Sequence, residues 1–194
     1  MAYYRNIGFG IALALLAPRF AAAFDGGSDC TQTVGESASV AQPIALVNVA
    51  GLNFGRIISG AAQGTITVSA AGQVTSNGVA NGPAVYTGSA YRVDPSAATF
   101  YVTGEPGYSY TIITPATSTV SDGAGHTMTV TLSAPSAQSV SGYAPSGYLN
   151  ANGTSSTIAS NGFDAWAIGA TITVSPNQAS GTYSGTFAEE VQYQ

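Results

Sequence analysis

The amino-acid sequence predicts an all-β fold, and three observations lead to this prediction. Amphipathic helix spacing is hard to find in windows of about a dozen residues beyond the N-terminal stretch. Val, Ile, Thr, Tyr and Phe instead recur with a period of two. Clusters of Gly, Asn, Pro and Ser separate these runs and supply turn signals such as Asn77-Gly78 and Asp122-Gly123. Roughly six to eight strands at this spacing suit a β-sandwich of immunoglobulin-like size, with a barrel as the alternative.

The expected strands follow from runs of β-branched and aromatic residues, which fit a pleated, half-buried surface. Proline, glycine and asparagine mark the turns between runs, as in Glu105-Pro106-Gly107 and Asn161-Gly162. Trp166 lies inside one run between alanines, and we expect it in the core. In chain order, the clearest runs are Ile44–Val49, Gly64–Ala70, Thr99–Thr103, Tyr108–Thr114, His126–Ser133, Ala165–Ser175 and Thr182–Tyr193.

Composition excludes several classes of function. A chain of 194 residues supports one domain, or one domain with a small appendage. Charged residues make up only 7%, lysine is absent and the formal net charge is −5, so phosphate-rich nucleic acid is not an expected partner. One His, one Cys and one Trp leave little material for a metal cluster, a catalytic triad or a disulfide framework. We therefore expect no enzymatic activity, no catalytic residues, no metal and no cofactor.

Residues 1–23 are expected to be a signal peptide. An arginine precedes the apolar run Ile7–Pro18, and Ala21-Ala22-Ala23 offers the small residues that a signal peptidase needs. The apolar run is too short to span a bilayer comfortably, so we expect no membrane span in the mature chain. The sequence predicts an exported protein, extracellular or at the cell surface, with an N-terminal extension at 24–43 and a β-sandwich domain at 44–194.

The extension carries the single cysteine. Cys30 lacks the leucine spacing of a lipoprotein signal, so a lipid anchor is not expected there. The thiol is either a spare group in a tail or half of an intermolecular disulfide. Removal of the signal peptide would leave Arg56 and Arg92 against nine acidic residues, and the mature protein is expected to be acidic.

The C-terminal run shows two distinct registers. Tyr183, Phe187, Val191 and Tyr193 share one register, interrupted only by a glycine and a glutamate. The other register is polar or small, so one face of this strand is expected to be buried and the other solvated. Gly181 stands where the strand is expected to open.

This ending resembles the C-terminal strand of chaperone–usher pilus subunits, where an upstream glycine and a penultimate aromatic residue frame alternating apolar residues. Further segments resemble the bacterial family known as domain of unknown function 4402, over essentially the whole mature chain. That resemblance implies an exported, fimbria-like protein with an immunoglobulin-like sandwich that serves as a polymer building block. The segments that carry it are Leu52-Asn53-Phe54-Gly55, 100–105 with 110–112, 126–130 and 168–187.

What the resemblance implies for assembly is a sandwich without its final strand, completed by a strand donated from another copy. The candidate donor is Val34–Gln42, with Val34, Ala38 and Val40 inserted into the groove and Glu36 either at its mouth or outside it. Expected partners are other copies of the chain, a periplasmic chaperone and an outer-membrane usher. Many pilus subunits carry a disulfide in their N-terminal half, and the single cysteine departs from that pattern.

The segment Pro135–Gly162 is the least regular part of the expected domain. Tyr143, Tyr148 and Leu149 lie there among Ser, Gly, Ala and Asn. Such a loop either binds a partner such as a glycan or covers the edge of the domain with its tyrosines. The alternative function is accordingly a monomeric secreted binding module.

Two remaining polar groups have simple interpretations. His126 follows Asp122 through a glycine-rich stretch, which predicts a turn before a strand and not a metal loop. Glu189 and Glu190 are adjacent on an expected strand, so they point to opposite faces and cannot form an acid–base pair.

Overall fold

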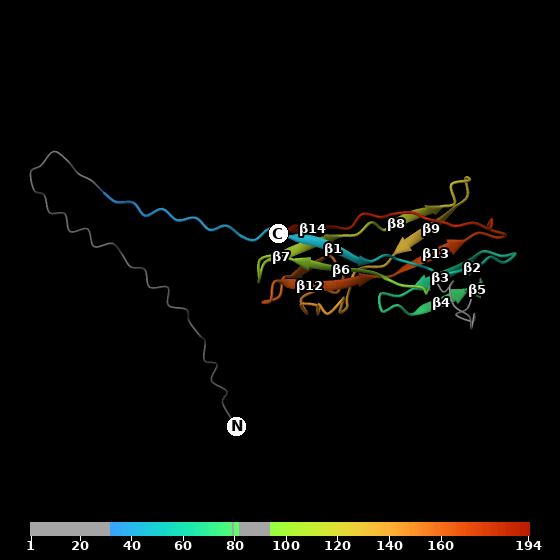
Figure 1. Ribbon diagram of the computed structural model, residues 1–194, viewed down its shortest axis with the longest axis horizontal. Helices are drawn as coiled ribbons and strands as arrows, with labels where there is room; N and C mark the ends of the chain where they lie inside the picture. The colour runs from blue at the N-terminus through green and yellow to red at the C-terminus, as the bar shows by residue number, and fades with distance from the viewer. Residues whose placement is uncertain (1–31, 79, 82–93) are drawn as a thin grey trace, which may run out of the picture. The chain divides into compact units, whose positions relative to one another are not determined.

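The protein was analysed as a computed structural model, which describes residues 32–78, 80–81 and 94–194 (Figure 1). The expected signal peptide, Cys30 and Arg92 lie outside these residues. The described part of the chain consists of β-strands, turns and extended segments and contains no helix, so the all-β prediction is confirmed. With no helix there, this part also contains no helical segment of the length and apolar character that crossing a membrane requires.

The strands form antiparallel sheets. A four-stranded sheet has the order β1-β6-β12-β10, and a three-stranded sheet has the order β11-β7-β14. Their bounds are β1 Ala45–Ala50, β6 Ala98–Thr103, β7 Ser109–Ile113, β10 Ser136–Ala137, β11 Ser155–Thr157, β12 Phe163–Ile168 and β14 Glu190–Tyr193.

A five-stranded sheet has the order β4-β3-β13-β9-β8, and β2 pairs with β5 in a small ribbon. The bounds here are β2 Ile57–Ile58, β3 Gly64–Val68, β4 Val74–Asn77, β5 Ala80–Asn81, β8 Thr117–Ser121, β9 Thr127–Leu132 and β13 Ala170–Val174.

Two expected strands differ from the observed ones. The run Ala165–Ser175 is not one strand, because the chain passes from β12 in one sheet to β13 in another at Gly169. A Cβ atom at Gly169 would overlap the backbone of Val68, so only glycine permits this close approach. In the run Thr182–Tyr193, only Glu190–Tyr193 is a regular strand. The part before it forms a single bridge, between Ser184 and Ser121 of β8.

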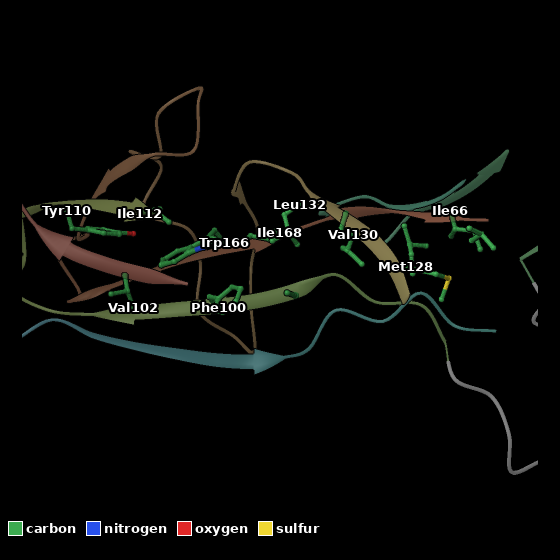
Figure 2. Packing of buried hydrophobic residues seen from close by; sticks show 14 of the residues in the cluster. Ile66, Phe100, Val102, Tyr110, Ile112, Met128, Val130, Leu132, Trp166 and Ile168 are labelled. Atoms are coloured by element: carbon green, nitrogen blue, oxygen red, sulfur yellow. The ribbon is translucent and has the colours of Figure 1, made fainter. Parts of the chain in front are cut away.

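The core collects side chains from several sheets (Figure 2). Trp166 of β12 is fully buried, as the sequence predicts. Its ring stacks on Phe100 of β6 at a centroid distance of 6.1 Å and lies 6.0 Å from Tyr110 of β7. Residues of β6 alternate between buried and half-buried, whereas five successive residues of β12 are buried. Both faces of β12 are thus covered by protein.

A buried carboxyl group connects the core to the irregular segment. Asp164 Oδ2 accepts hydrogen bonds from Tyr110 Oη at 2.7 Å and from Ser156 Oγ at 2.6 Å. Asp164 Oδ1 accepts from the backbone N–H groups of Ser146 at 2.6 Å and Ala165 at 2.8 Å. Burial, and secondarily the negative charge of Asp164, raise the pKa of Tyr110 far above its usual range. The phenol therefore remains a donor at any physiological pH.

Replacement of Asp164 by asparagine tests this network. The amide presents N–H groups to partners that are themselves donors, so Asp164→Asn should lower the free energy of unfolding by about 3 kcal/mol. Tyr110→Phe removes a single donor and should cost about 1.5 kcal/mol. Urea unfolding followed by the fluorescence of the single tryptophan measures both changes. Equal stability of Asp164→Asn and the parent would contradict this account.

Candidate functional site: an apolar groove beside the C-terminal segment

A large groove lies along the core. Its volume is about 1630 Å³, and it runs between the stretch from β1 to β2 and residues 178–189 of the C-terminal segment. A drug-sized ligand pocket is usually about 300–1,000 Å³, so this groove suits a longer occupant such as an extended peptide. Its floor consists of core side chains from β6, β9 and β13, namely Ala98, Phe100, Met128, Val130, Ile172 and Val174.

β1 flanks the groove, which it lines with Leu46 and Asn48, whereas β14 lies beyond the lining residues, the last of which in chain order is Glu189. β1 lies at the edge of its sheet, where its described neighbour is β6. β14 lies at the edge of another sheet, where its described neighbour is β7. Within the described ranges no ladder joins β1 to the C-terminal segment, and the backbone pairing of this segment with β8 is the bridge between Ser184 and Ser121 at 2.9 Å. Such edges offer backbone N–H and C=O groups to an added strand.

The C-terminal segment keeps the alternation that the sequence shows. Tyr183, Phe187, Val191 and Tyr193 are half-buried and pack against the core. Phe187 contacts Phe100 edge-on at a centroid distance of 6.4 Å. The residues between them are exposed apart from Glu189, so one face of the segment forms a wall of the groove and the other faces solvent.

The glycine that this segment requires is not the one expected from the sequence. Gly181 is exposed, and a Cβ atom there would make only ordinary contacts, the nearest at 3.4 Å from Asp122. A Cβ atom at Gly185 would overlap the carbonyl oxygen of Thr119 in β8. Gly185 thus lets the segment lie directly against the backbone of β8. In the sequence, Gly185 can be recognised because it interrupts the register of aromatic residues between Tyr183 and Phe187.

One acidic residue lines the otherwise apolar part of the groove. Glu189 Oε1 accepts a hydrogen bond from Thr114 Oγ1 at 2.9 Å. Its Oε2 atom is buried without a hydrogen bond of good geometry, and so is Trp166 Nε1. Removal from water raises the pKa of Glu189 to about 7, although Thr114 and the nearby indole N–H favour the ionised form. Glu190 is exposed, so the two glutamates face opposite sides as expected.

The expected donor residues are exposed. Residues 32–42 form no strand, and Val34 and Val40 expose 77% and 97% of their surface. Ala38 is exposed as well. The chain divides into two compact units at Ser39, and the β-sheet unit begins at Val40. The apolar side chains of Val34, Ala38 and Val40 are thus exposed to solvent. A donor segment that has not been inserted into a groove would have the same property.

The three residues of the expected binding loop have different surroundings. Tyr143 stacks on Tyr101 at a centroid distance of 4.4 Å and lies 4.8 Å from Phe163. Leu149 packs against the core, and only Tyr148 is strongly exposed, at 64%. The structure therefore does not gather them into one surface. Tyr143 covers Tyr101 of β6 and Phe163 of β12 in the four-stranded sheet.

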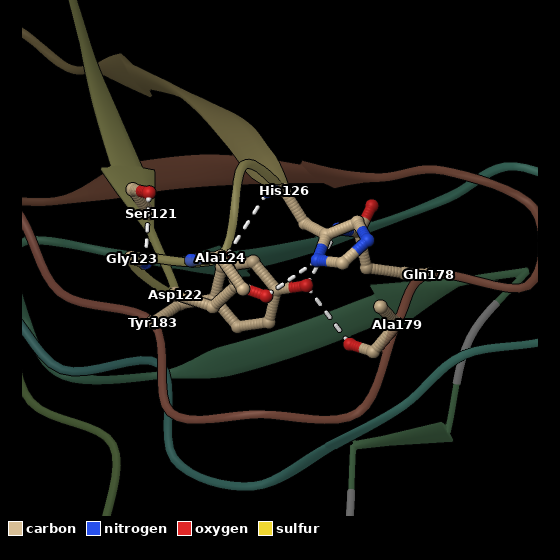
Figure 3. Close-up of polar contacts among 8 residues, drawn as sticks. All are labelled: Ser121, Asp122, Gly123, Ala124, His126, Gln178, Ala179 and Tyr183. Carbon is tan, nitrogen blue, oxygen red and sulfur yellow. Dashed lines mark hydrogen bonds and ion pairs between the residues drawn. The ribbon is translucent and has the colours of Figure 1, made fainter.

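His126 belongs to a turn, as predicted (Figure 3). Asp122 Oδ2 lies 2.6 Å from His126 Nδ1, and Asp122 Oδ1 accepts hydrogen bonds from the N–H groups of Ala124 and His126. Partial burial of the carboxyl group raises the pKa of Asp122, but these hydrogen bonds lower it by more. The pKa of Asp122 therefore lies below its usual value. In the same region Tyr183 Oη donates to the carbonyl of Ala179 at 2.8 Å. No group of three or more potential metal ligands occurs in the described ranges.

The fold and the groove define an all-β domain with a cleft between β1 and the C-terminal segment. The chain belongs to the family described as domain of unknown function (DUF4402), whose sequence model matches residues 44–193. The resemblance to this family is thus confirmed over most of the chain. Neither the curated proteins nor the solved structures contain a match.

The carboxyl group in the groove predicts a pH dependence of stability. Glu189 keeps its proton to about pH 7 in the folded state but releases it near 4.5, its ordinary value, in the unfolded state. Between these values the folded state binds more protons, so the free energy of unfolding falls as pH rises and levels off above pH 7. Glu189→Gln should remove this slope and stabilise the protein at pH 8 by on the order of 1 kcal/mol, after allowance for solvent screening.

The matched control for this experiment is Glu190→Gln at the exposed neighbour. Urea unfolding of the parent and both variants at several pH values between 4.5 and 8 measures the slope. The other charged residues that line the groove, Arg56 and Asp94, remain unchanged in all three proteins. A slope that persists in Glu189→Gln, or disappears in Glu190→Gln, would show that another group carries the pH dependence.

Proposed function

We propose that the protein is a structural, non-enzymatic subunit of an extracellular fimbria-like or pilus-like filament or surface matrix, and that it polymerises by donor-strand exchange. The domain is then an immunoglobulin-like sandwich that a strand from another copy completes. The observation that carries the proposal is the groove of about 1630 Å³, which combines an apolar floor with the edge strand β1 on one side and the C-terminal segment on the other.

An extended peptide satisfies both features of the groove at once. Its backbone can pair with the edges of β1 and the C-terminal segment, and alternate side chains can enter the apolar floor. A compact ligand would fill only part of the volume and leave the edges without partners. Strand donation of this kind is the known mode of assembly of pilus subunits, whose C-terminal strand this chain resembles.

The N-terminal extension supplies a suitable donor. Residues 34–42 are exposed, carry alternating apolar side chains and contain only one charged residue, Glu36. The length of this segment in residues equals that of the stretch 181–189, which lies along the groove. The small side chains of Val34, Ala38 and Val40 suit a groove whose floor already carries phenylalanine, methionine and isoleucine. In this proposal the protein is exported, and a periplasmic chaperone and an usher assist its assembly.

The alternative of a monomeric glycan-binding module has less support. It depends on a shared surface formed by Tyr143, Tyr148 and Leu149, and two of these side chains pack against the protein. The remaining side chain, Tyr148, offers a single aromatic ring for stacking on a ligand.

Two substitutions at adjacent positions of the extension test the donor role. Ala38→Asp places a carboxylate in the register that enters the groove, where desolvation costs several kcal/mol. Ser37→Asp adds the same charge in the opposite register, which faces solvent in the filament. We expect the first variant to fold but to remain monomeric, and the second to polymerise like the parent. Size-exclusion chromatography and negative-stain electron microscopy of the mature full-length chains compare them.

Equal polymerisation of both variants would rule out residues 34–42 as the donor. Absence of filaments from the parent under all assembly conditions, including the presence of chaperone and usher, would rule out the proposed function itself. A synthetic peptide of residues 32–42 provides an independent measurement, because binding to the groove should raise the midpoint of unfolding.

A further inference from the structure

One carboxyl group lies in the apolar register of the groove wall. Glu189 shares the register of Phe187, whose ring packs against the core, and both residues line the groove. Glu190 pairs with Ile113 at the start of β14, and this pairing brings Glu189 beside Thr114. The other large side chains of this register cover the core with apolar atoms, so an acid at this position calls for a physical account.

The surroundings of Glu189 suit a neutral carboxyl group better than a carboxylate. Its Oε2 atom is buried without a hydrogen bond among the described residues, and Oε1 accepts one, from Thr114. The buried indole N–H of Trp166 lies nearby but forms no hydrogen bond of good geometry. Removal of a charge from water with so few donors costs far more than removal of a neutral acid. Burial accordingly raises the pKa of Glu189 to about 7.

No charged neighbour offsets this cost within the described part of the chain. The groups that act on the carboxyl are the Thr114 hydroxyl and the Trp166 indole, and both are neutral. Arg56 and Asp94 line the same groove, but neither contributes to the shift of this pKa. The protonation state of Glu189 therefore depends on how much water reaches the side chain through the groove.

An occupant of the groove would remove that water. The empty groove is large enough to hold water beside Glu189, whereas a strand laid along the C-terminal segment would displace it. The candidate donor 34–42 contains no lysine, arginine or histidine, and its one charged residue is Glu36. Such a strand offers no cation to a carboxylate in the wall, so it can be inserted at low cost only against neutral Glu189.

We propose that insertion of a strand into the groove is coupled to uptake of a proton by Glu189, so that acidic pH favours assembly and alkaline pH opposes it. This inference rests on the proposed function and adds a means of regulation to it. The occupied groove binds the proton more tightly than the empty groove does. Affinity for the strand is therefore constant below about pH 7 and falls as pH rises above it.

The test measures binding of a labelled synthetic peptide of residues 32–42. The acceptor is the mature full-length chain with Ala38→Asp, which should remain monomeric and keep its groove empty. The peptide should bind about tenfold more weakly at pH 8 than at pH 6, since each pH unit above the pKa of Glu189 weakens binding by about that factor. Acetylated and amidated peptide ends exclude titration of a terminal amino group in this range.

Further substitutions in this acceptor identify the group that takes up the proton. Glu189→Gln should bind the peptide equally at both pH values, as tightly as the unsubstituted acceptor does at pH 6. Glu190→Gln is the matched control at the exposed neighbour, and His126→Gln tests the one imidazole, because histidine ordinarily titrates near neutral pH. Both should keep the pH dependence. Thr114→Val removes a hydrogen bond that favours the ionised form, so weakening should begin at higher pH.

A second readout follows Glu189 itself in the empty groove. Trp166 is the single tryptophan of the chain, and its fluorescence should respond to ionisation of the adjacent carboxyl group. The change should be centred near pH 7 in the acceptor, be absent from Glu189→Gln and move to higher pH when the peptide fills the groove.

The possible failures are distinguishable. Equal peptide affinity at both pH values, together with a fluorescence change near pH 7, would show that the inserted strand leaves Glu189 hydrated. The coupling would then be wrong while the proposed function stands. A pH dependence of binding that persists in Glu189→Gln, or the lack of a fluorescence change that depends on Glu189, would overturn the coupling as well. An acceptor that binds no peptide at either pH would refute the proposed function and the coupling together.

Discussion

The stacking of Trp166 between Phe100 and Tyr110 is the contact on which the rest of the structure depends. It joins β12 and β6 of one sheet to β7 of another, and Tyr110 in turn donates to the buried Asp164. Aromatic rings bury large apolar areas with few rotatable bonds, so they stabilise a core at low cost in entropy. In a chain with only 7% charged residues, ion pairs contribute little and apolar packing must supply most of the stability.

That packing is complete on one side of the molecule and open on the other. β12 is covered on both faces, and the floor of the groove is already shielded from solvent. The apolar surface that stays partly exposed there belongs to the walls of the groove, among them Leu52, Phe54 and Phe187. Exposed apolar surface costs about 25 cal/mol per Å², so an occupant that covers these walls gains free energy without any new charge contact. The same open side explains why Glu189 can reach solvent in part and yet hold its proton to about pH 7.

Local periodicity predicted much of the fold, because β3, β7 and β9 lie within the expected runs of β-branched or aromatic residues, and β1 and β6 extend only one residue beyond theirs. β8 and β11 escaped prediction, since serine and threonine dominate them and their apolar alternation is weak. The change of sheet at Gly169 depends on contact with Val68, far away in the sequence. The hydrogen bonds of the Tyr193 hydroxyl are equally hidden, because it meets Glu105 across 88 positions and Gln42 across 151.

The hydrogen bonds that join Gln42, Glu105 and Tyr193 also affect how the domain would respond to mechanical load. Tension applied through the residues before Gln42 enters β1 along the chain and reaches β14 through Tyr193. β14 pairs with β7 along its whole length, and ladder hydrogen bonds run perpendicular to the strands. The component of this tension that acts along β14 therefore loads these bonds together in shear instead of opening them one after another.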